Sequence, residues 1–363
     1  MSIAATGFAI GDAATPDLAV AAVREALARA GENLAGSVLL FLTHHFARNA
    51  QGTVTAAAKA ARCLQVAGCT APGVFTENAW SLDQPAAAAL VLCGNLGLCH
   101  AQGALPTLTL ATPASGHYLQ DDHPSRFGLL STDAGGARGG RVWLGAKVAR
   151  QGFCEAIFEG ARVAAGASRG MLLLSDAMEV TDVDGHELFE LAGQPALAGL
   201  HASLPPVPDD VPLPPVSHLF AVVPDPAMDA RQAFLEGRYG LLPVVGFSAD
   251  EQSVTLAMPL PPGERILWAL RQPAAAERDT AALLARLAIA VPRPDFALLF
   301  ACIGRGPYFF GGEDRDRAAV GERFPGLPVV GAYGGGEIAP LPGGSALISY
   351  SAVLALVGGD VQS

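Results

Sequence analysis

Two glycine-containing turns near the end of the chain hold the side chains best suited to binding a small charged molecule. In the first turn, Gly304 and Gly306 allow the backbone to approach a bound group closely, and Arg305 between them is a planar donor fork suited to a carboxylate or phosphate. In the second turn, three consecutive glycines leave Glu337 as a lone carboxylate. A guanidinium and a carboxylate together match the two charges of an amino-acid zwitterion.

The predicted ligand site combines these two turns with an earlier Gly-Cys-Thr segment. Its residues are Cys302, Gly304, Arg305, Gly306, Gly331, Tyr333, Gly335, Glu337, Cys69 and Thr70. A second interpretation of the arginine stays open, because a buried bond from Arg305 to Glu337 or to the backbone would pin two loops without any ligand. Cys302 is either a small packed side chain or a thiol made more reactive by its basic neighbour.

The sequence patterns of common catalytic sites do not occur in the chain. There is no G-x-S-x-G elbow, no P-loop, no H-E-x-x-H zinc motif and no G-x-G-x-x-G opening a helix after the first strand. All eight histidines lie in the first 218 residues, so a histidine base for Cys302 would have to come from a distant segment. We therefore predict a binding protein and not an enzyme.

The segments that must position these residues alternate between strand and helix patterns. A helix is predicted from Thr15 to Gly31, because Pro16 suits a first helical turn and apolar residues then recur with helical spacing. A buried strand at Ser37–Thr43, a helix at 52–65, a small-residue loop at Val66–Glu77 and a strand at Ala86–Cys93 follow it.

Similar strand–helix–strand units recur along the chain. Further copies are expected at 171–203, with a helix near 185–192, at 296–337, with a helix at 315–323, and more weakly at 218–250, and a last strand is expected at 346–357. Recurrent units of this kind predict an α/β fold of two lobes, with mixed sheets flanked by helices.

A proline-rich stretch marks the predicted boundary between the lobes. Residues 204–216 contain six prolines, which cannot continue a helix or an inner strand. We therefore expect one lobe at residues 1–215 and another at 216–363. A glycine-rich stretch at Thr132–Arg141 is expected to be a surface loop of the first lobe.

Composition excludes several classes of partner. With 363 residues, 51% of them hydrophobic, the chain can bury a large core, and its net charge of -11 disfavours binding to nucleic acid. No basic segment with a long apolar run opens the chain, and no run reaches the length of about 20 apolar residues that a membrane-spanning helix needs. We expect a cytoplasmic protein with six reduced cysteines and, since there is no C-x-x-C pair, no metal site.

The two C-terminal motifs resemble those of the FIST domain family. Cys-Ile-Gly-Arg-Gly at 302–306, followed by Gly-Glu-Ile at 336–338, is similar to the C-terminal half of that family, and Gly68-Cys-Thr resembles its N-terminal half. The chain departs from the family at 346–352, where Ala-Leu-Ile-Ser-Tyr-Ser-Ala replaces the usual polar His/Asn–Thr element. Any ligand contact made by that element is therefore in question.

The resemblance implies a FIST N-terminal-like lobe and a FIST C-terminal-like lobe in a sensor that binds a small amino-acid-like or anionic metabolite. It also permits a haem-based nitric-oxide sensor, for which the candidate ligands are His44 and His45, with His100 and His201 as further candidates. A third alternative is a protein-interaction scaffold, or an enzyme whose reaction the sequence does not indicate. Because the two lobes fill the chain, a sensor of this kind is expected to act through a signalling partner, with 307–312 as a candidate contact.

Overall fold

The computed structural model describes residues 3–101, 105–119, 125–133, 139–206 and 213–359. The chain divides into two compact units, of which the first is discontinuous and consists of Met1–Ser168 and Asp279–Ser363. The second unit, Arg169–Arg278, is inserted between the two segments of the first. None of the described helices has both the length and the apolar composition that crossing a bilayer requires.

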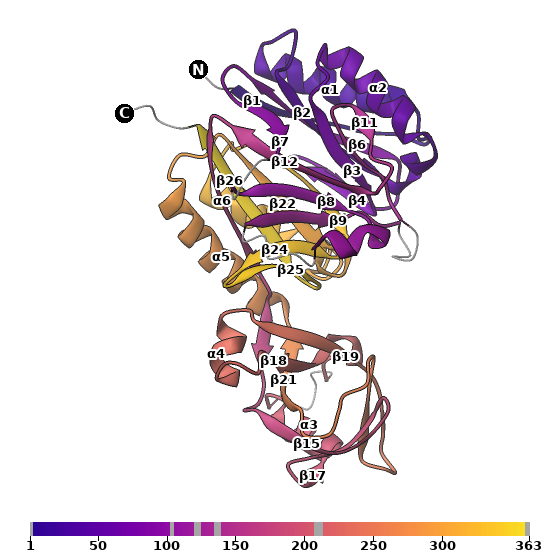
Figure 1. The fold of residues 1–363 in the computed structure, drawn as a ribbon, viewed down its shortest axis with the longest axis vertical. Coiled ribbons are helices and arrows are strands. Elements are labelled where there is room, and N and C mark those ends of the chain that lie inside the picture. Colours follow the sequence, from indigo (N-terminus) through magenta and orange to yellow (C-terminus); the bar gives the residue numbers. More distant parts are fainter. Residues whose placement is uncertain (1–2, 102–104, 120–124, 134–138, 207–212, 360–363) are drawn as a thin grey trace. The chain divides into compact units, whose positions relative to one another are not determined.

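Two sheets of the first unit share one topology (Figure 1). One has the order β1 (Ile3–Ile10), β6 (Ala86–Cys93), β2 (Ser37–Thr43), β3 (Val66–Ala71), β10 (Val142–Leu144) and β11 (Lys147–Val148). The other has the order β13 (Ala161–Ser168), β26 (Ala352–Gly359), β22 (Phe296–Cys302), β23 (Val329–Gly334), β4 (Gly73–Thr76) and β5 (Trp80–Ser81). Each contains one parallel pair, β2 with β3 and β22 with β23, among antiparallel neighbours. The predicted duplication of α/β layers is confirmed for these two copies.

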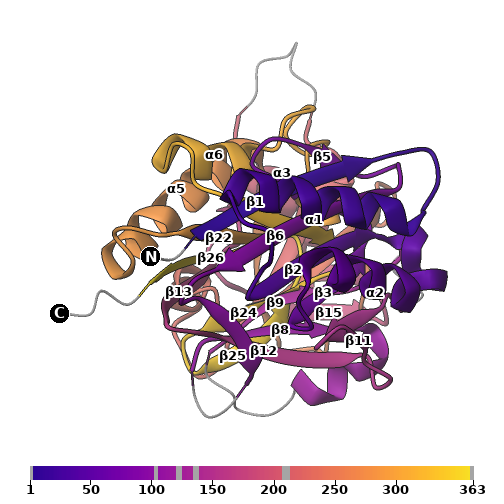
Figure 2. The same ribbon diagram turned by 90° about the horizontal axis from the view of Figure 1, so that it is seen from above.

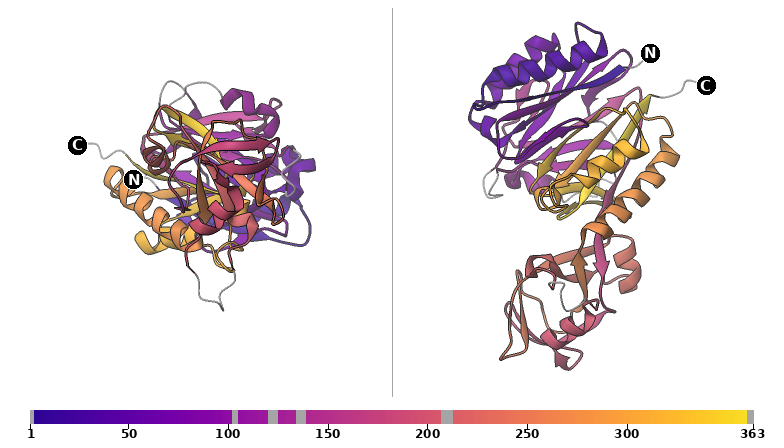
Figure 3. Two further views of the ribbon diagram at one scale, coloured as in Figure 1. Left: turned by 90° about the horizontal axis from the view of Figure 1, so that it is seen from below. Right: turned by 180° about the vertical axis from the view of Figure 1, so that it is seen from behind.

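Helices cover one face of each of these sheets. α1 (Pro16–Ala30) and α2 (Ala50–Ala61) pack on the first sheet, and α5 (Pro273–Ala290) and α6 (Arg315–Arg323) pack on the other (Figures 2 and 3). The opposite faces of both sheets contribute to one shared core, in which Phe41 of β2 meets Phe300 of β22 edge to face. A short 3-10 turn follows the first strand of each parallel pair: η1 (His44–Asn49) follows β2, and η4 (Ile303–Arg305) follows β22.

A third sheet of the first unit lies against the shared core. Its order is β25 (Gly344–Ile348), β24 (Glu337–Leu341), β9 (Arg126–Leu130), β8 (Thr107–Ala111), β12 (Phe153–Glu159) and β7 (Gly97–His100), and the 3-10 turn η2 (Pro113–Leu119) lies beyond β8. Leu108 and Phe127 of this sheet belong to the same buried cluster as Phe41 and Phe300. The fold class predicted from the sequence, mixed sheets flanked by helices, is confirmed.

The second unit is built mainly from antiparallel strands whose pairings close into a ring. The ring runs β21 (Arg265–Arg271), β15 (Met178–Asp184), β16 (Glu187–Leu191), β20 (Ser253–Leu256), β19 (Tyr239–Ser248) and β18 (Leu219–Pro224), which pairs again with β21. β14 (Met171–Leu173), β17 (Gln194–Pro195), α3 (Ala196–Ser203), η3 (Val216–His218) and α4 (Ala230–Leu235) complete it. Trp268 and Leu197 belong to its core.

Three expectations about elements and boundaries are corrected by the structure. The helix expected near 185–192 is the strand β16, because Gly185 and Gly193 adopt left-handed φ angles of 56° and 72° and reverse the chain on both sides of it. The loop expected at Val66–Glu77 is mostly the strands β3 and β4. The boundary expected near residue 215 falls inside the second unit, since Leu204 and Val216 pack against one core. The loop predicted at 132–141 lies partly outside the described residues.

Candidate functional site

Arg305 lies at the end of η4 and is almost completely buried, with 1% of its surface exposed. Its Nε donates to Asp316 Oδ2 at 2.8 Å, and its Nη2 donates to Asp316 Oδ1 at 2.9 Å. Nη1 donates to the carbonyl oxygen of Ser168 at 2.8 Å, while Nη2 also contacts Ser168 Oγ at 2.7 Å and Thr280 Oγ1 at 2.9 Å. Protein groups therefore engage all three nitrogens of the guanidinium.

These partners lie where the chain leaves and re-enters the first unit. Ser168 is the last residue before the inserted unit, and Asp279 and Thr280 are the first two residues after it. Ser168 Oγ contacts Asp279 Oδ2 at 3.0 Å, and Thr280 Oγ1 donates to Asp316 Oδ1 at 2.5 Å. We call Ser168, Asp279, Thr280, Arg305 and Asp316 the crossing cluster.

The charge of Arg305 is stabilised within this cluster. Burial alone would lower the pKa of the guanidinium, but the nearby carboxylates of Asp316, Asp279 and Glu337 outweigh burial and raise that pKa above its ordinary value. The prediction that Arg305 presents a free donor fork to a ligand in an open hollow is therefore wrong. The alternative, in which the arginine pins segments of the chain together, describes the geometry.

Tyr333 and Asp314 form a second buried polar pair beside the crossing cluster. The Tyr333 hydroxyl donates to Asp314 Oδ2, and the other oxygen of Asp314 accepts the backbone N–H of Arg317 at 2.9 Å, which caps the start of α6. Burial, reinforced by the charge of Asp316, raises the pKa of Asp314. Burial and the charge of Asp314 raise the pKa of Tyr333 well above its ordinary value. Tyr333, predicted to contact a ligand, thus belongs to the interior.

Glu337 and Cys302 converge at the carboxyl ends of β22 and β23, as the two-turn prediction requires. Glu337 is fully buried, and its Oε2 accepts a hydrogen bond from Ser351 Oγ at 2.5 Å. The backbone N–H of Cys302 donates to the carbonyl oxygen of Ser351 at 2.9 Å, and Cys302 is itself 6% exposed. The two turns therefore meet, but the carboxylate lies in the interior, and the expectation that it faces an open hollow is wrong.

The other predicted site residues serve packing. Cys69 is buried in β3, and burial raises the pKa of its thiol well above the ordinary value. Thr70 accepts hydrogen bonds from Ser131 Oγ at 2.6 Å and from the Arg141 backbone N–H at 2.8 Å. Gly331 and Gly335 are sites of close packing: an added Cβ would lie 1.9 Å from Leu299 O at Gly331 and 2.6 Å from Thr132 Cγ2 at Gly335. Gly306 is buried and Gly304 half-buried.

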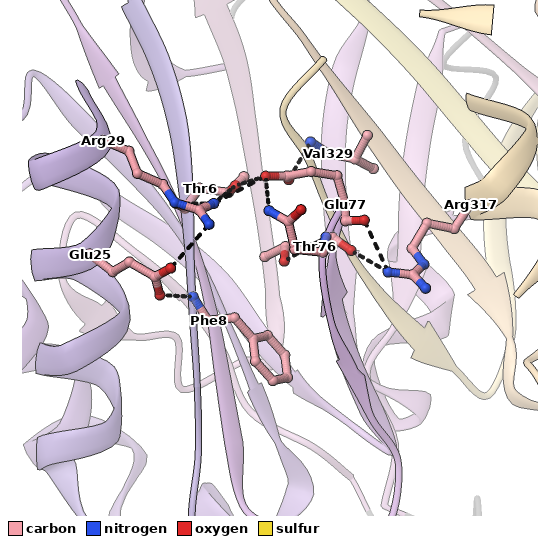
Figure 4. Close-up of polar contacts among 9 residues, drawn as sticks. Thr6, Phe8, Glu25, Arg29, Thr76, Glu77, Arg317 and Val329 are labelled. Atoms are coloured by element: carbon pink, nitrogen blue, oxygen red, sulfur yellow. Dashed lines mark hydrogen bonds and ion pairs between the residues drawn. The ribbon is translucent and has the colours of Figure 1, made fainter. Parts of the chain in front are cut away.

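A further polar junction connects the N-terminal and C-terminal segments of the first unit (Figure 4). Glu77 Oε1 accepts hydrogen bonds from Thr6 Oγ1 at 2.6 Å and Arg29 Nη1 at 3.3 Å, and its Oε2 accepts the Val329 backbone N–H at 3.0 Å. Arg317 Nη1 donates to the carbonyl oxygens of Thr76 and Glu77. One carboxylate thus fixes the relative positions of β1, α1 and β23.

The histidines of the haem alternative do not fit a haem site. The rings of His44 and His45 are next to each other, with centroids 4.1 Å apart and planes tilted by 30°, so they cannot bind opposite faces of one iron. Burial and the neighbouring His44 lower the pKa of His45, and the Asp83 carboxylate beside it opposes that shift. A carboxylate next to an exposed imidazole is unlike the apolar cleft that haem requires. His100 and His201 are both exposed.

Sequence reasoning missed the partners of Arg305. Asp316, Ser168 and Thr280 belong to three separate segments, and Ser168 is 137 positions from Arg305. One local signal was present: the alternating Asp-Arg-Asp-Arg at 314–317 places two carboxylates at the start of a helix, one of which caps it.

Comparison with known proteins finds similarity to uncharacterized proteins of Mycobacterium. The chain is 28% identical to the uncharacterized protein Rv0628c of Mycobacterium tuberculosis strain H37Rv, over 96% of this chain and 98% of that protein. It is 29% identical to the uncharacterized protein Mb0898c of Mycobacterium bovis, over 63% of this chain and 60% of that protein.

The family comparison is more informative. Residues 209–340 match the FIST C domain, and this range includes both glycine turns and the crossing-cluster residues Asp279, Thr280, Arg305 and Asp316. The match supports the resemblance inferred from the sequence for the C-terminal part of the chain: residues 209–340 are similar to the FIST C domain, and the FIST domain family is a sensory one implicated in signal transduction.

Proposed function

We propose that this protein is a sensor that reversibly binds a small anionic or zwitterionic metabolite, catalyses no reaction and acts through a signalling partner in the cytoplasm. The observation that carries the proposal is the contact of Arg305 with residues on both sides of the inserted unit. A change in the first unit that moves η4 or α6 alters the hydrogen bonds that hold Ser168 and Thr280. The crossing cluster is therefore suited to transmit a binding event along the chain.

The chemistry of the cysteines supports binding without catalysis. Burial raises the pKa of Cys154 to about 12, so its thiol stays protonated at neutral pH. Cys302, the thiol of the signature segment, is buried with its backbone tied to Ser351. All six cysteines are free thiols, as a reducing compartment would leave them.

Two measurements on the full chain test the proposal. In a thermal-shift screen with the twenty protein amino acids and a set of organic acids, at least one compound is expected to raise the unfolding temperature. At 100 times its Kd, such a compound should add about 2.7 kcal/mol to the free energy of unfolding. If no compound stabilises the protein, the sensor proposal is wrong.

Hydrogen exchange then tests transmission through the crossing cluster. The stabilising compound is expected to change amide exchange at 165–168 and 279–283, while Thr280→Val, which removes one donor of the cluster, should reduce that response. Arg286→Ala, an exposed position on the same helix α5, is the matched control. Equal responses in the Thr280→Val and Arg286→Ala proteins would contradict transmission by this route.

A further inference from the structure

Trp80 and Tyr308 form an aromatic corner on the surface of the first unit. Their ring centres lie 6.5 Å apart, and their planes are nearly perpendicular, at 87°. Tyr308 is 67% exposed and Trp80 is half-buried, so neither side chain is enclosed in the interior. The corner joins the strand β5 to the segment 307–312, which the sequence indicated as a candidate contact.

The indole of Trp80 is held in place by its sheet. β5 pairs with β4, with Trp80 opposite Phe75, and β5 is the last strand in the order of this sheet. Trp80 packs against the buried cluster that contains Phe75 and Tyr333. Because the residue is half-buried, part of its side chain is anchored on the core and part of it reaches the surface.

The ring of Tyr308 is held by a carboxyl group. Its hydroxyl donates to Asp83 Oδ2 at 2.8 Å. Asp83 lies in the turn after β5, where Ser81 Oγ donates to the carbonyl oxygen of Gln84 at 3.0 Å. The bond to Asp83 and the charge of that carboxylate raise the pKa of the Tyr308 hydroxyl, so the ring stays uncharged at neutral pH. Both rings are therefore positioned before any ligand arrives, and less conformational entropy is lost on binding.

The spacing of the two rings suits a cation. A cation is attracted to the face of an aromatic ring when it lies within about 6 Å of the ring centre, and aromatic residues recognise methylated ammonium groups in this way. A cation about 4.5 Å above each of two perpendicular faces requires ring centres about 6.4 Å apart. The observed separation is 6.5 Å. The separation and angle of Trp80 and Tyr308 thus match those of a two-sided cation site.

Asp83 adds a carboxylate to this corner. Tyr308 engages only its Oδ2, and within the part of the chain that the structure describes Oδ1 accepts no hydrogen bond, so this oxygen is available to a cation. His45 brings no competing charge at neutral pH, because burial and the neighbouring His44 lower its pKa more than Asp83 raises it. A quaternary ammonium group has no N–H to donate, so aromatic faces and a nearby carboxylate are the groups that recognise it.

We infer that Trp80, Tyr308 and Asp83 form a binding site for a quaternary ammonium group. The two rings contact its methyl groups, and Asp83 supplies negative charge beside them. The group belongs to a free compound such as choline or to a trimethylated lysine side chain of another protein, since both present the same trimethylammonium head. This site is separate from the metabolite binding of the proposed function and does not rest on it.

Calorimetric titration of the full chain with choline, and with a short peptide that carries one trimethyllysine, tests the inference. At least one of the two should bind. Its uncharged analogue, in which a carbon atom replaces the ammonium nitrogen, should bind more weakly by about fivefold or more. Tighter binding of the peptide assigns the site to a protein partner, and tighter binding of choline assigns it to a small molecule.

Three variants locate the binding at this corner. Tyr308→Ala should weaken binding by about fivefold or more. Asp83→Asn keeps an acceptor for the Tyr308 hydroxyl but removes the charge, so it should weaken binding of the ammonium compound and leave binding of the uncharged analogue unchanged. Phe247→Ala, which removes an aromatic side chain that is 49% exposed in the second unit, is the matched control and should bind as the unchanged protein does.

The outcomes separate this site from the proposed sensor function. If neither compound binds, if the uncharged analogue binds equally well, or if Tyr308→Ala binds as tightly as the unchanged protein, the inference is wrong. Because Trp80 packs against the core, Tyr308→Ala at the exposed position carries the test, and circular dichroism checks its fold. A protein that amino acids or organic acids stabilise but that binds no quaternary ammonium compound would overturn this site and leave the sensor proposal standing.

Discussion

The guanidinium of Arg305 and the carboxylate of Asp316 form a buried two-point ion pair, with N···O distances of 2.8 Å and 2.9 Å. Each side chain is 1% exposed. A pair removed from water in this way is stabilised only as long as both charges and their other hydrogen bonds are present. In this protein the remaining bonds join the pair to Ser168 and Thr280, which belong to the first unit and flank the inserted unit in the sequence.

Removing one member of that pair is expected to be costly. Arg305→Ala leaves Asp316 as an uncompensated buried charge and should lower the free energy of unfolding by about 3–5 kcal/mol. Replacing both residues, as in Arg305→Met with Asp316→Leu, should cost less than the sum of the single losses. Urea denaturation of the single and double variants measures the difference, and strict additivity would show that the two charges do not depend on each other.

The close approach of two glycines to neighbouring strands gives a second prediction. Gly68 and Gly331 occupy the same register in the duplicated sheets, opposite Leu40 and Leu299, and an added Cβ would lie 1.8 Å and 1.9 Å from those carbonyl oxygens. Alanine at either glycine forces the parallel strands apart, at a cost of about 1–3 kcal/mol or more.

A third glycine serves as the control for these substitutions. Gly321 lies in α6, and no atom lies within 4 Å of the Cβ that alanine would add. Gly321→Ala should raise the free energy of unfolding by up to about 1 kcal/mol, because alanine favours helix. Thermal unfolding of the three alanine variants tests the contrast. Equal stabilities would mean that the strands can move apart without loss.

Asp314 predicts a pH dependence of stability. Its pKa is raised in the folded protein above the ordinary value of 3.8, mainly by burial, so the folded state binds the proton more tightly than the unfolded state. This group therefore contributes stability that is fully present below about pH 4 and is lost as pH rises through the folded-state pKa. Asp314→Asn removes that contribution.

The measurement is the free energy of unfolding in urea between pH 4 and pH 8. Relative to the Asp314→Asn protein, the unchanged protein should lose stability as pH increases across the lower part of this range. Asn can still accept the Arg317 N–H, so the helix cap is kept in the variant. Parallel pH profiles of the two proteins would contradict a raised pKa at Asp314.

Glu77 and Arg29 contact each other, and we expect their replacement to lower the stability of the protein by different amounts. Glu77→Ala leaves the Val329 backbone N–H and the Thr6 hydroxyl without their acceptor and should cost about 1–3 kcal/mol. Arg29→Ala removes a guanidinium whose side chain is 43% exposed, so the loss should stay below about 1 kcal/mol. Chemical denaturation measures the free energy of unfolding of both variants. A larger loss of stability for Arg29→Ala than for Glu77→Ala would contradict this prediction.

Local patterns in the sequence predicted much of the duplicated α/β architecture. The first helix is confirmed, because Pro16 at its first turn and the helical spacing of Val23 and Leu27 are properties of adjacent residues. The strands β2 and β22 were likewise foreseen from short apolar runs, whereas β3, the parallel partner of β2, lies in the stretch that was predicted as a loop. The hairpin at β16 was mistaken for a helix because the left-handed turns around it were not recognised.

The sequence by itself also predicted that the two glycine turns carrying Arg305 and Glu337 would lie close together, and its two C-terminal motifs indicated the resemblance to the FIST domain family. Only the tertiary structure decided what Arg305 binds, since Ser168 and Asp316 are brought to it by a chain that leaves the first unit and returns. The tertiary structure also decides which charged side chains are buried, because the segments that pack over a side chain can be far from it in the sequence. For that reason the signature arginine is enclosed in the interior and does not face solvent.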